Sequence, residues 1–170
     1  WAGYQRERAR LIVVAVGAYQ LMEVLAASRR LTEQEISHIV VCLLEPGRFR
    51  APRSISEAGH QASPEVIARL FPAKVVPRLF MTHTRPETIL GLLGPLHTGA
   101  QTAGLGYINQ GGTLSTPGMH FVNRCSWAHC LREAARLLQL AESEVLSQEE
   151  RHALDGQRSP HGVIVPETVI

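Results

Sequence analysis

Three apolar stretches mark the first half of the chain, the first two of them continuous runs. The run "LIVVAVG" (11–17) is rich in β-branched residues and ends at a glycine, "SHIVVCLLEP" (37–46) ends at a proline, and "VPRLFMTH" (76–83) follows. A continuous apolar run of this length is typical of a strand that is buried on both faces of a sheet. We therefore predict strands over 11–17, 37–46 and 76–83, with the first one central.

Between the first two runs, the hydrophobic positions recur at helical spacing. Residues 18–31 place Leu21, Val24 and Leu31 on one stripe and end in a basic turn that suits the helix dipole. Strand, helix and strand within about 35 residues form a βαβ unit, whose two strands pair in parallel. The sheet is therefore predicted to be at least partly parallel.

The middle of the chain has weaker periodicity. A helix is predicted over 63–71, because Ser63 suits the N-cap and Pro64 the first helical position. A second helix over 85–96 should be short, since Gly91 weakens it and Pro95 breaks it. The segment "AGLGYINQ" (103–110) is predicted to be a fourth strand that enters the polar stretch 111–118.

The last third is predicted to be helical. Residues 126–140 set Trp127, Leu131 and Leu138 on one face, with Ser126 as the N-cap. A smaller helix should follow, with Ser147 and Glu150 forming a capping box and Gly156 ending it. The apolar tail 161–170 either adds an edge strand or hangs free.

These elements predict an α/β fold with three layers (αβα) and a mixed, mostly parallel sheet of about five strands. Residues 1–10 have the character of a linker, 11–156 form the domain, and 157–170 form a C-terminal tail. Because the chain opens with Trp1 and has no initiator methionine, we expect it to be a piece of a longer polypeptide.

Composition narrows the class of protein. The chain has 170 residues, 45% of them hydrophobic, which suffices for one core. Lys and Arg number 17 against 15 Asp and Glu and are scattered, so we expect no nucleic-acid partner. The longest apolar run is far shorter than the about 20 residues that cross a bilayer, so we expect no membrane partner. Three cysteines without a signal-peptide pattern favour a reducing, cytoplasmic location.

Cysteine and histidine gather near the start of the helix predicted over 126–140. Cys125 and His129 are four residues apart, with Cys130 and His120 nearby, but this is not the spacing of a zinc site. Cys125 near a helix N-terminus resembles an activated thiol, yet no nucleophile motif surrounds it, and a semi-buried residue is the favoured interpretation. We therefore predict neither zinc nor a disulfide.

Polar groups at strand ends are the other candidates. Arg48, Arg50 and Arg53 can grip a phosphate or carboxylate, although a solvated or interface loop is the favoured interpretation. The turn after the first strand can hold an anion on its backbone amides, but most α/β proteins have such a turn. His83 and Arg85 follow the third strand at its carboxyl edge, where open α/β sheets bind ligands.

The order of these segments resembles the C-terminal domain of thiamine-diphosphate enzymes of the transketolase superfamily. The stretch "GYINQGGTLSTPGMHFVNRCSWAH" (106–129) is similar to phosphoketolases and to phosphoketolase-like sugar-phosphate enzymes, xylulose 5-phosphate epimerases among them. The segments "EPGRFRAP" (45–52) and "THTRPETILGLLG" (82–94) are also similar to the decarboxylating component of pyruvate dehydrogenase. The resemblance covers residues 10–140, approximately.

The resemblance implies a parent enzyme acting on ketose phosphates, in which this is the third, non-catalytic domain and supports a homodimer. The upstream domains of the same polypeptide are then its partners, and thiamine diphosphate and Mg²⁺ bind there. The chain has no glycine-aspartate-glycine motif, since its one Asp-Gly pair, Asp155-Gly156, follows Leu154 at a helix end. We therefore expect no cofactor in this fragment and assign no catalytic residue.

Residues 109–118 are interpreted as a shaped loop against neighbouring domains, with Asn109, Gln110 and Thr113 as candidate contacts. Two alternatives remain open. The parent can instead be a 2-oxo acid dehydrogenase component, or the domain can be a module that binds an effector around His83, Arg85 and the Arg48 loop.

Overall fold

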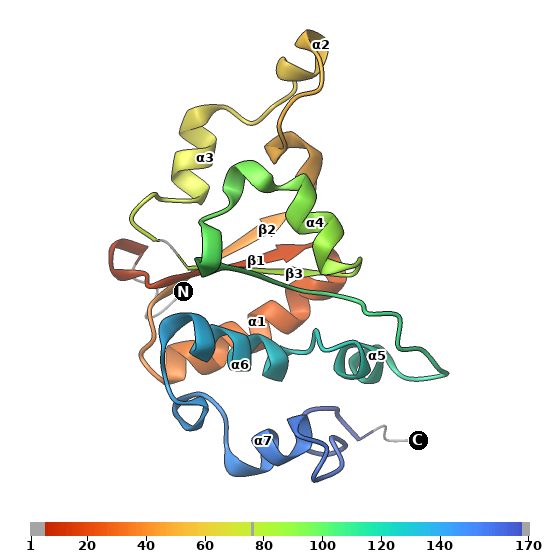
Figure 1. Ribbon diagram of the computed structural model, residues 1–170. Coiled ribbons are helices and arrows are strands. Elements are labelled where there is room, and N and C mark those ends of the chain that lie inside the picture. The colour runs from red at the N-terminus through yellow and green to blue at the C-terminus, as the bar shows by residue number, and fades with distance from the viewer. Residues whose placement is uncertain (1–5, 76, 168–170) are drawn as a thin grey trace.

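The computed structural model describes residues 6–75 and 77–167, and its centre is one parallel sheet (Figure 1). The described strands are β1 (Leu11–Val16), β2 (His38–Leu43), β3 (Arg78–Thr82) and β4 (Thr102–Leu105). They lie in the order β2-β1-β3-β4, and each neighbouring pair is parallel. The predicted α/β class is confirmed, but the described sheet has four strands rather than about five, and none is antiparallel.

The central strand β1 explains the uninterrupted apolar run. Its six residues are all buried, and they alternate between two cores on opposite faces of the sheet. Leu11 and Val13 face one core, whereas Ile12 and Val14 face the other. Because side chains alternate along a strand, only a strand covered on both sides needs apolar residues at every position.

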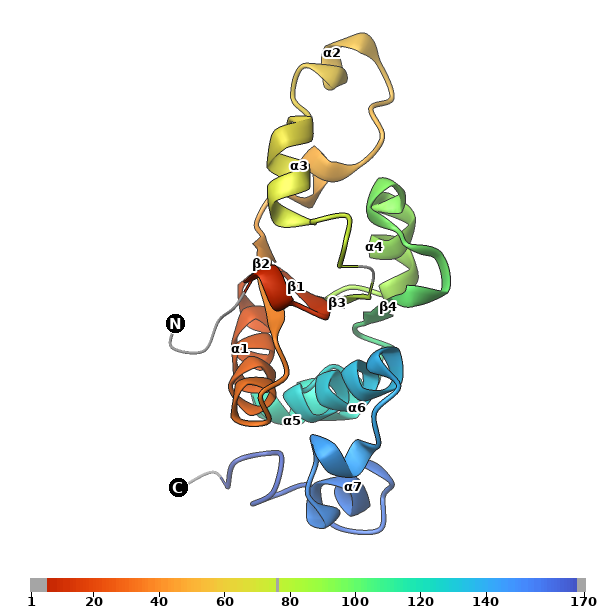
Figure 2. The same ribbon diagram turned by 90° about the vertical axis from the view of Figure 1, so that its left-hand side faces the viewer.

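Helices cover both faces of the sheet, as the edge-on view in Figure 2 shows. One face carries α1 (Ala18–Glu33), α5 (Thr116–Val122) and α6 (Trp127–Leu138), with α7 (Gln148–Leu154) beyond them. The other face carries α3 (Pro64–Leu70) and α4 (Pro86–Leu92). The sheet and the helices on its two faces therefore form a three-layer αβα fold.

Short elements complete the chain. The small helix α2 (Ile55–Ala58) lies in a projecting segment, residues 44–62, which we call the arm. Single 3-10 turns occupy Arg6–Arg8, Pro46–Phe49, Gly94–Leu96, Gly99–Gln101 and Glu142–Glu144.

Helix caps follow the predicted chemistry in two cases. The Ser63 hydroxyl accepts a hydrogen bond from the Val66 amide at the start of α3. Ser147 and Glu150 form the capping box of α7. Ser126 does occupy the N-cap of α6, but its side chain makes no capping bond there, and another residue described below takes that role.

Two predicted segments differ in the structure. The strand expected over 103–110 ends at Leu105, and residues 106–115, which we call the crossover loop, run on without strand pairing. Part of the stretch expected to be a loop is instead the helix α5, capped by Ser115, whose hydroxyl accepts from the Gly118 amide. Thr-Pro-Gly suggested a turn, yet Pro117 stands in the first helical turn, where its missing N–H costs nothing.

The C-terminal tail packs on the domain as far as it is described. Ile164 and Val165 are buried, Ile164 in the same core as α6, and Trp127 Nε1 donates to the Ile164 carbonyl at 3.3 Å. Its one described β feature is an isolated bridge between His161 and Val165.

Candidate functional site

The carboxyl ends of all four described strands meet at one edge of the sheet, because every pair is parallel. The chain leaves β1 into α1 on one face, whereas it leaves β3 into α4 on the opposite face. The ends of β1 and β3 therefore form a topological switch point, the place where open α/β sheets leave room for a ligand. Gly17 and His83 are the first residues after these two strands.

Gly17, Gln20 and His83 converge at this switch point. A Cβ added to Gly17 would lie 3.2 Å from His83 Nδ1 and 3.8 Å from Gln20 Oε1. Gly17 also has φ +98°, which residues with a side chain rarely adopt. The position therefore favours glycine for its backbone conformation, and a Cβ there would require the His83 ring to shift by a few tenths of an ångström.

Gln20 is the least expected of the three. It is fully buried in the first turn of α1, and both its amide nitrogen and its amide oxygen lack a hydrogen-bond partner among the described residues. An unpaired buried polar group costs about 1–3 kcal/mol, so proteins seldom keep one without a role. His83, by contrast, is exposed.

One turn further along α1, Glu23 joins three helices. Its carboxylate accepts from His120 Nδ1 at 2.7 Å and from the Trp127 backbone amide at 2.7 Å. Glu23 thus caps α6 in place of Ser126, and it fixes His120 of α5. His120 is buried, and its Nε2 has no partner in the described part of the chain.

The crossover loop completes this edge of the sheet. The Tyr107 amide donates to the Thr84 carbonyl at 3.1 Å, and a Cβ on Gly106 would collide with that same oxygen. The Tyr107 ring lies 6.2 Å from the His120 ring, centroid to centroid. His83, the loop and the Glu23–His120 pair are therefore contiguous.

Buried Asn123 holds the crossover loop from below. Its Oδ1 accepts from the amides of Ile108 and Gln110, both at 3.1 Å, and its Nδ2 donates to the Gln110 carbonyl at 2.7 Å. The predicted contacts Asn109, Gln110 and Thr113 have exposed side chains. Thr113 also borders a cavity of about 240 Å³ between the loop and the C-terminal tail.

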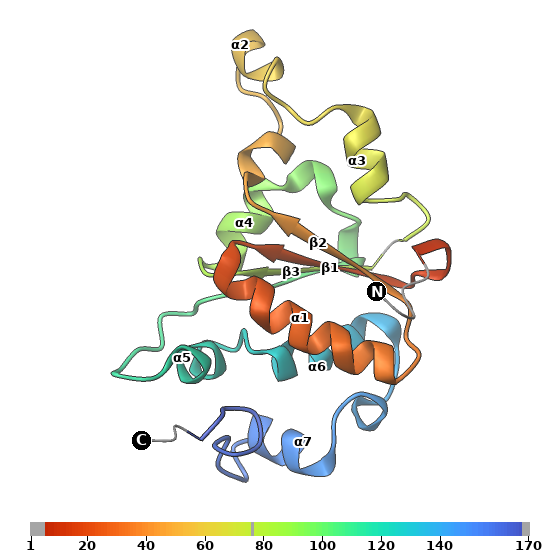
Figure 3. The ribbon, with the colours of Figure 1, turned by 180° about the vertical axis from the view of Figure 1, so that it is seen from behind.

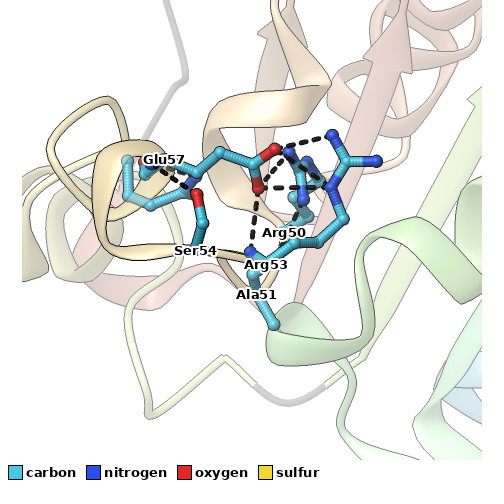
Figure 4. A network of polar contacts seen from close by, with 6 residues as sticks. Arg50, Ala51, Arg53, Ser54 and Glu57 are labelled. Atoms are coloured by element: carbon cyan, nitrogen blue, oxygen red, sulfur yellow. Dashed lines mark hydrogen bonds and ion pairs between the residues drawn. The ribbon is translucent and has the colours of Figure 1, made fainter.

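Two of the three arginines of the arm are engaged with one carboxylate. Arg53 Nη2 and Arg50 Nη2 lie 2.6 and 2.7 Å from the Glu57 carboxylate (Figure 4). Hydrogen bonds from Arg53, and then those from Arg50, lower the Glu57 pKa to about 2. Arg48 is exposed and lines a cavity of about 540 Å³ at the base of the arm.

The predicted site residues lie in three segments of the structure. His83 and Arg85 stand at the end of β3, and the crossover loop with Asn109, Gln110 and Thr113 begins beside them. Arg48 and Arg50 belong to the arm, which packs through Phe49 on the face of the sheet that also carries α4, the helix that begins after Arg85.

Cys125 and Cys130 have the properties of core residues, whereas Cys42 is exposed. Burial raises the Cys125 pKa to about 12, with a further contribution from Glu23, and burial also raises the Cys130 pKa. Neither is a thiolate at neutral pH. Within residues 6–75 and 77–167, no three potential metal ligands cluster, and the cysteines are free thiols.

The only aspartate of the chain, Asp155, accepts a hydrogen bond from Arg132 Nη2 through Oδ1 at 2.8 Å, at the C-terminal end of α7. No step through thiamine diphosphate is derived for the chain.

Sequence reasoning found His83 but missed Gln20, Glu23 and the role of His120. One signal was present, because Gln20 and Glu23 share the buried stripe of α1 with Ala27 and Leu31. Polar residues on a core-facing stripe are informative wherever they occur.

No protein-family model matches the chain, and no curated protein is significantly similar to it. In the part of the chain that the structure describes, no helix combines the length and apolar character needed to cross a bilayer.

Proposed function

We propose that the chain is the C-terminal, non-catalytic domain of a thiamine-diphosphate enzyme that acts on ketose phosphates. The motifs of the crossover loop and of α5 suggest phosphoketolase-like enzymes within the transketolase superfamily. In this proposal the domain packs against upstream domains of the same polypeptide and supports a homodimer. The cofactor and Mg²⁺ then bind in those upstream domains.

One observation of the structure carries this proposal. Large apolar side chains are exposed on two segments that follow the carboxyl ends of β1 and β4, the first turns of α1 and the crossover loop. Figure 3 shows the backbone of both segments. Tyr19 and Met22 on α1 are 69% and 67% exposed, and Ile108 and Leu114 of the crossover loop are also exposed. Gathered apolar residues of this kind mark surfaces that another domain covers.

The first experiment compares the 170-residue chain with a polypeptide that includes the residues encoded upstream of Trp1. The longer polypeptide should bind thiamine diphosphate with Mg²⁺ in calorimetric titration and should convert xylulose 5-phosphate. The chain alone should give no saturable heat, because it has no glycine-aspartate-glycine motif to hold the diphosphate and its metal. Micromolar cofactor binding by the chain alone, or none by the longer polypeptide, would contradict the proposal.

A second experiment tests the surface. Met22→Asp places a charge on the exposed apolar edge, whereas Arg29→Asp changes an exposed residue further along the same helix. In the longer polypeptide, Met22→Asp should weaken the dimer or expose the domain to proteolysis, and Arg29→Asp should not. In the isolated chain both variants should unfold close to the wild-type midpoint. Equal behaviour of the two variants in the longer polypeptide would argue against packing at this edge.

A further inference from the structure

The start of α1 is an N-terminus without a side-chain cap. Its N-cap is Gly17, no side chain accepts its first amides among the described residues, and its first turn contains no acidic residue. The first N–H groups of a helix lack acceptors within the helix, and the dipole of a 16-residue helix favours an anion there. By itself this feature is common in α/β folds.

Gln20 is the second, independent observation. Its amide is completely buried and has no partner in the described chain, and its oxygen lies within 4 Å of the position that a Gly17 Cβ would occupy. The amide is therefore directed at the N-cap of the same helix. An amide offers two N–H donors and one acceptor, so it suits a ligand that has both acceptor oxygens and a hydroxyl.

His83 lies over the same point from β3. Its Nδ1 is 3.2 Å from the Gly17 Cβ position, and its side chain is exposed, so it is free to swing outward and uncover the Gln20 amide. The nearest carboxylate on α1, Glu23, has both oxygens engaged by His120 and Trp127. The donors around Gly17 therefore face no competing free carboxylate from the described residues of α1.

We propose that the switch point binds the phosphate group of a small phosphate ester. The first amides of α1, Gln20 Nε2 and a ring N–H of His83 donate to the phosphate oxygens. Gln20 Oε1 accepts from a hydroxyl of the ester. Gly17 allows the phosphate to approach the backbone, since any side chain there would occupy its place.

This site lies wholly within the chain and does not depend on the proposed function. Inorganic phosphate is the probe, followed by amide chemical shifts in the 170-residue chain. Phosphate stabilises most proteins by exclusion from their surface, so a thermal shift would not be specific, whereas saturable shifts are. Ribose 5-phosphate and adenosine monophosphate then distinguish a sugar phosphate from a nucleotide, with ribose as the uncharged control.

Wild type should show saturable shifts at residues 17–20 and 83. Gln20→Leu should weaken phosphate binding by about tenfold or more, because it removes hydrogen bonds to a charged group. Gln34→Leu, the same substitution at the exposed C-terminal end of α1, should bind as wild type does. His83→Ala, at an exposed position, tests the site in a folded background if Gln20→Leu does not fold.

Absence of saturable shifts in wild type would overturn the proposal. Equal binding by wild type, Gln20→Leu and His83→Ala would mean an adventitious ion only, and would overturn it as well. Neither result bears on the domain assignment, because the assignment is tested by cofactor binding in the longer polypeptide.

Discussion

The arm and the crossover loop both leave the carboxyl edge of the sheet, and they are held in opposite ways. The arm follows β2, and its segment is held by ion pairs near solvent, from Arg50 and Arg53 to the Glu57 carboxylate. The crossover loop follows β4 and is tied from beneath by the uncharged amide of buried Asn123. The charged loop is the more conspicuous in the sequence, yet its charges satisfy one another.

The comparison indicates which polar groups are still available to bind a ligand. In the described chain, Gln20 and His120 at the carboxyl edge have buried polar atoms without hydrogen-bond partners, and neither residue stands in a charged cluster of the sequence. In the arm, Gln61 Oε1 is also buried without a partner. Exposed ion pairs contribute little to stability, whereas a buried polar group must be paired or it is costly. The search for a site is therefore better directed by unpaired burial than by local charge.

The largest loss of stability is expected for Glu23→Ala. The substitution leaves His120 Nδ1 and the Trp127 amide without their acceptor at the junction of α1, α5 and α6. Removing one member of a buried pair of this kind should lower the free energy of unfolding by about 3 kcal/mol. Urea denaturation measures the loss. Glu33→Ala, at an exposed position of α1, should change it far less, and equal losses would refute the buried role of Glu23.

Asn123→Ala should have the next largest effect. It removes the acceptor of two loop amides and the donor to the Gln110 carbonyl, so we expect a loss of about 2 kcal/mol. The amides of Ile108 and Gln110 should lose hydrogen-exchange protection more than those of β1. Asn109→Gly, at an exposed position with φ +64°, serves as the control and should leave both amides protected. Unchanged protection in Asn123→Ala would mean that the conformation of the crossover loop does not depend on the Asn123 side chain.

Acid should act differently on the arm and on the buried core that contains His129 of α6 and His38 of β2. Burial, followed by the nearby Arg132 and Arg124, lowers the His129 pKa from 6.5 to about 4, and burial also lowers the His38 pKa. Between these values the unfolded chain binds more protons than the folded one, so stability falls as the pH decreases from about 6.5 toward 4. His129→Gln should lose about 1–2 kcal/mol less over that range than wild type in urea titrations.

Exposed His97 provides the control, because His97→Gln should follow the wild-type curve. In the arm, by contrast, the ion pairs of Glu57 should persist over this pH range. With its pKa at about 2, Glu57 keeps its ion pairs well below the ordinary value of 4.5 and loses them only near pH 2. Parallel stability curves for wild type and His129→Gln would contradict the buried, neutral state of His129.

The smallest global effect is expected for Glu57→Gln. Its ion pairs lie near solvent, so the midpoint of urea unfolding should not move measurably. Trypsin should nevertheless cleave faster after Arg50 or Arg53, since both lose their shared partner. Glu45→Gln, which removes only a 4.0 Å ion pair with Arg48, should leave the cleavage rate unchanged. A large shift of the midpoint would show that the arm is part of the core.

The parts of the fold that follow local rules were predictable from the sequence. The strand β1 is apolar at every position because both faces are covered, and α7 begins with a capping box that four residues define. The helix α5 was missed because its Ser-Thr-Pro-Gly start is equally suited to a turn and its seven residues are too few for clear periodicity.

The site depends on pairs that are far apart in the chain. Glu23 meets His120 across 97 positions and Trp127 across 104, and no local pattern announces such a contact. His83 could be chosen in advance only because a strand end has a known place in a parallel sheet. Gln20 is a candidate because its buried amide has no hydrogen-bond partner among the described residues, and only the three-dimensional structure shows this.

Cys42 gives the molecule a built-in chemical handle. It is exposed on β2, at an edge of the sheet, whereas Cys125 and Cys130 are buried with raised pKa values. A maleimide dye should therefore label one position without any engineered mutation. Because Cys42 also lines the cavity at the base of the arm, the emission of that dye would report in real time whether another domain settles there.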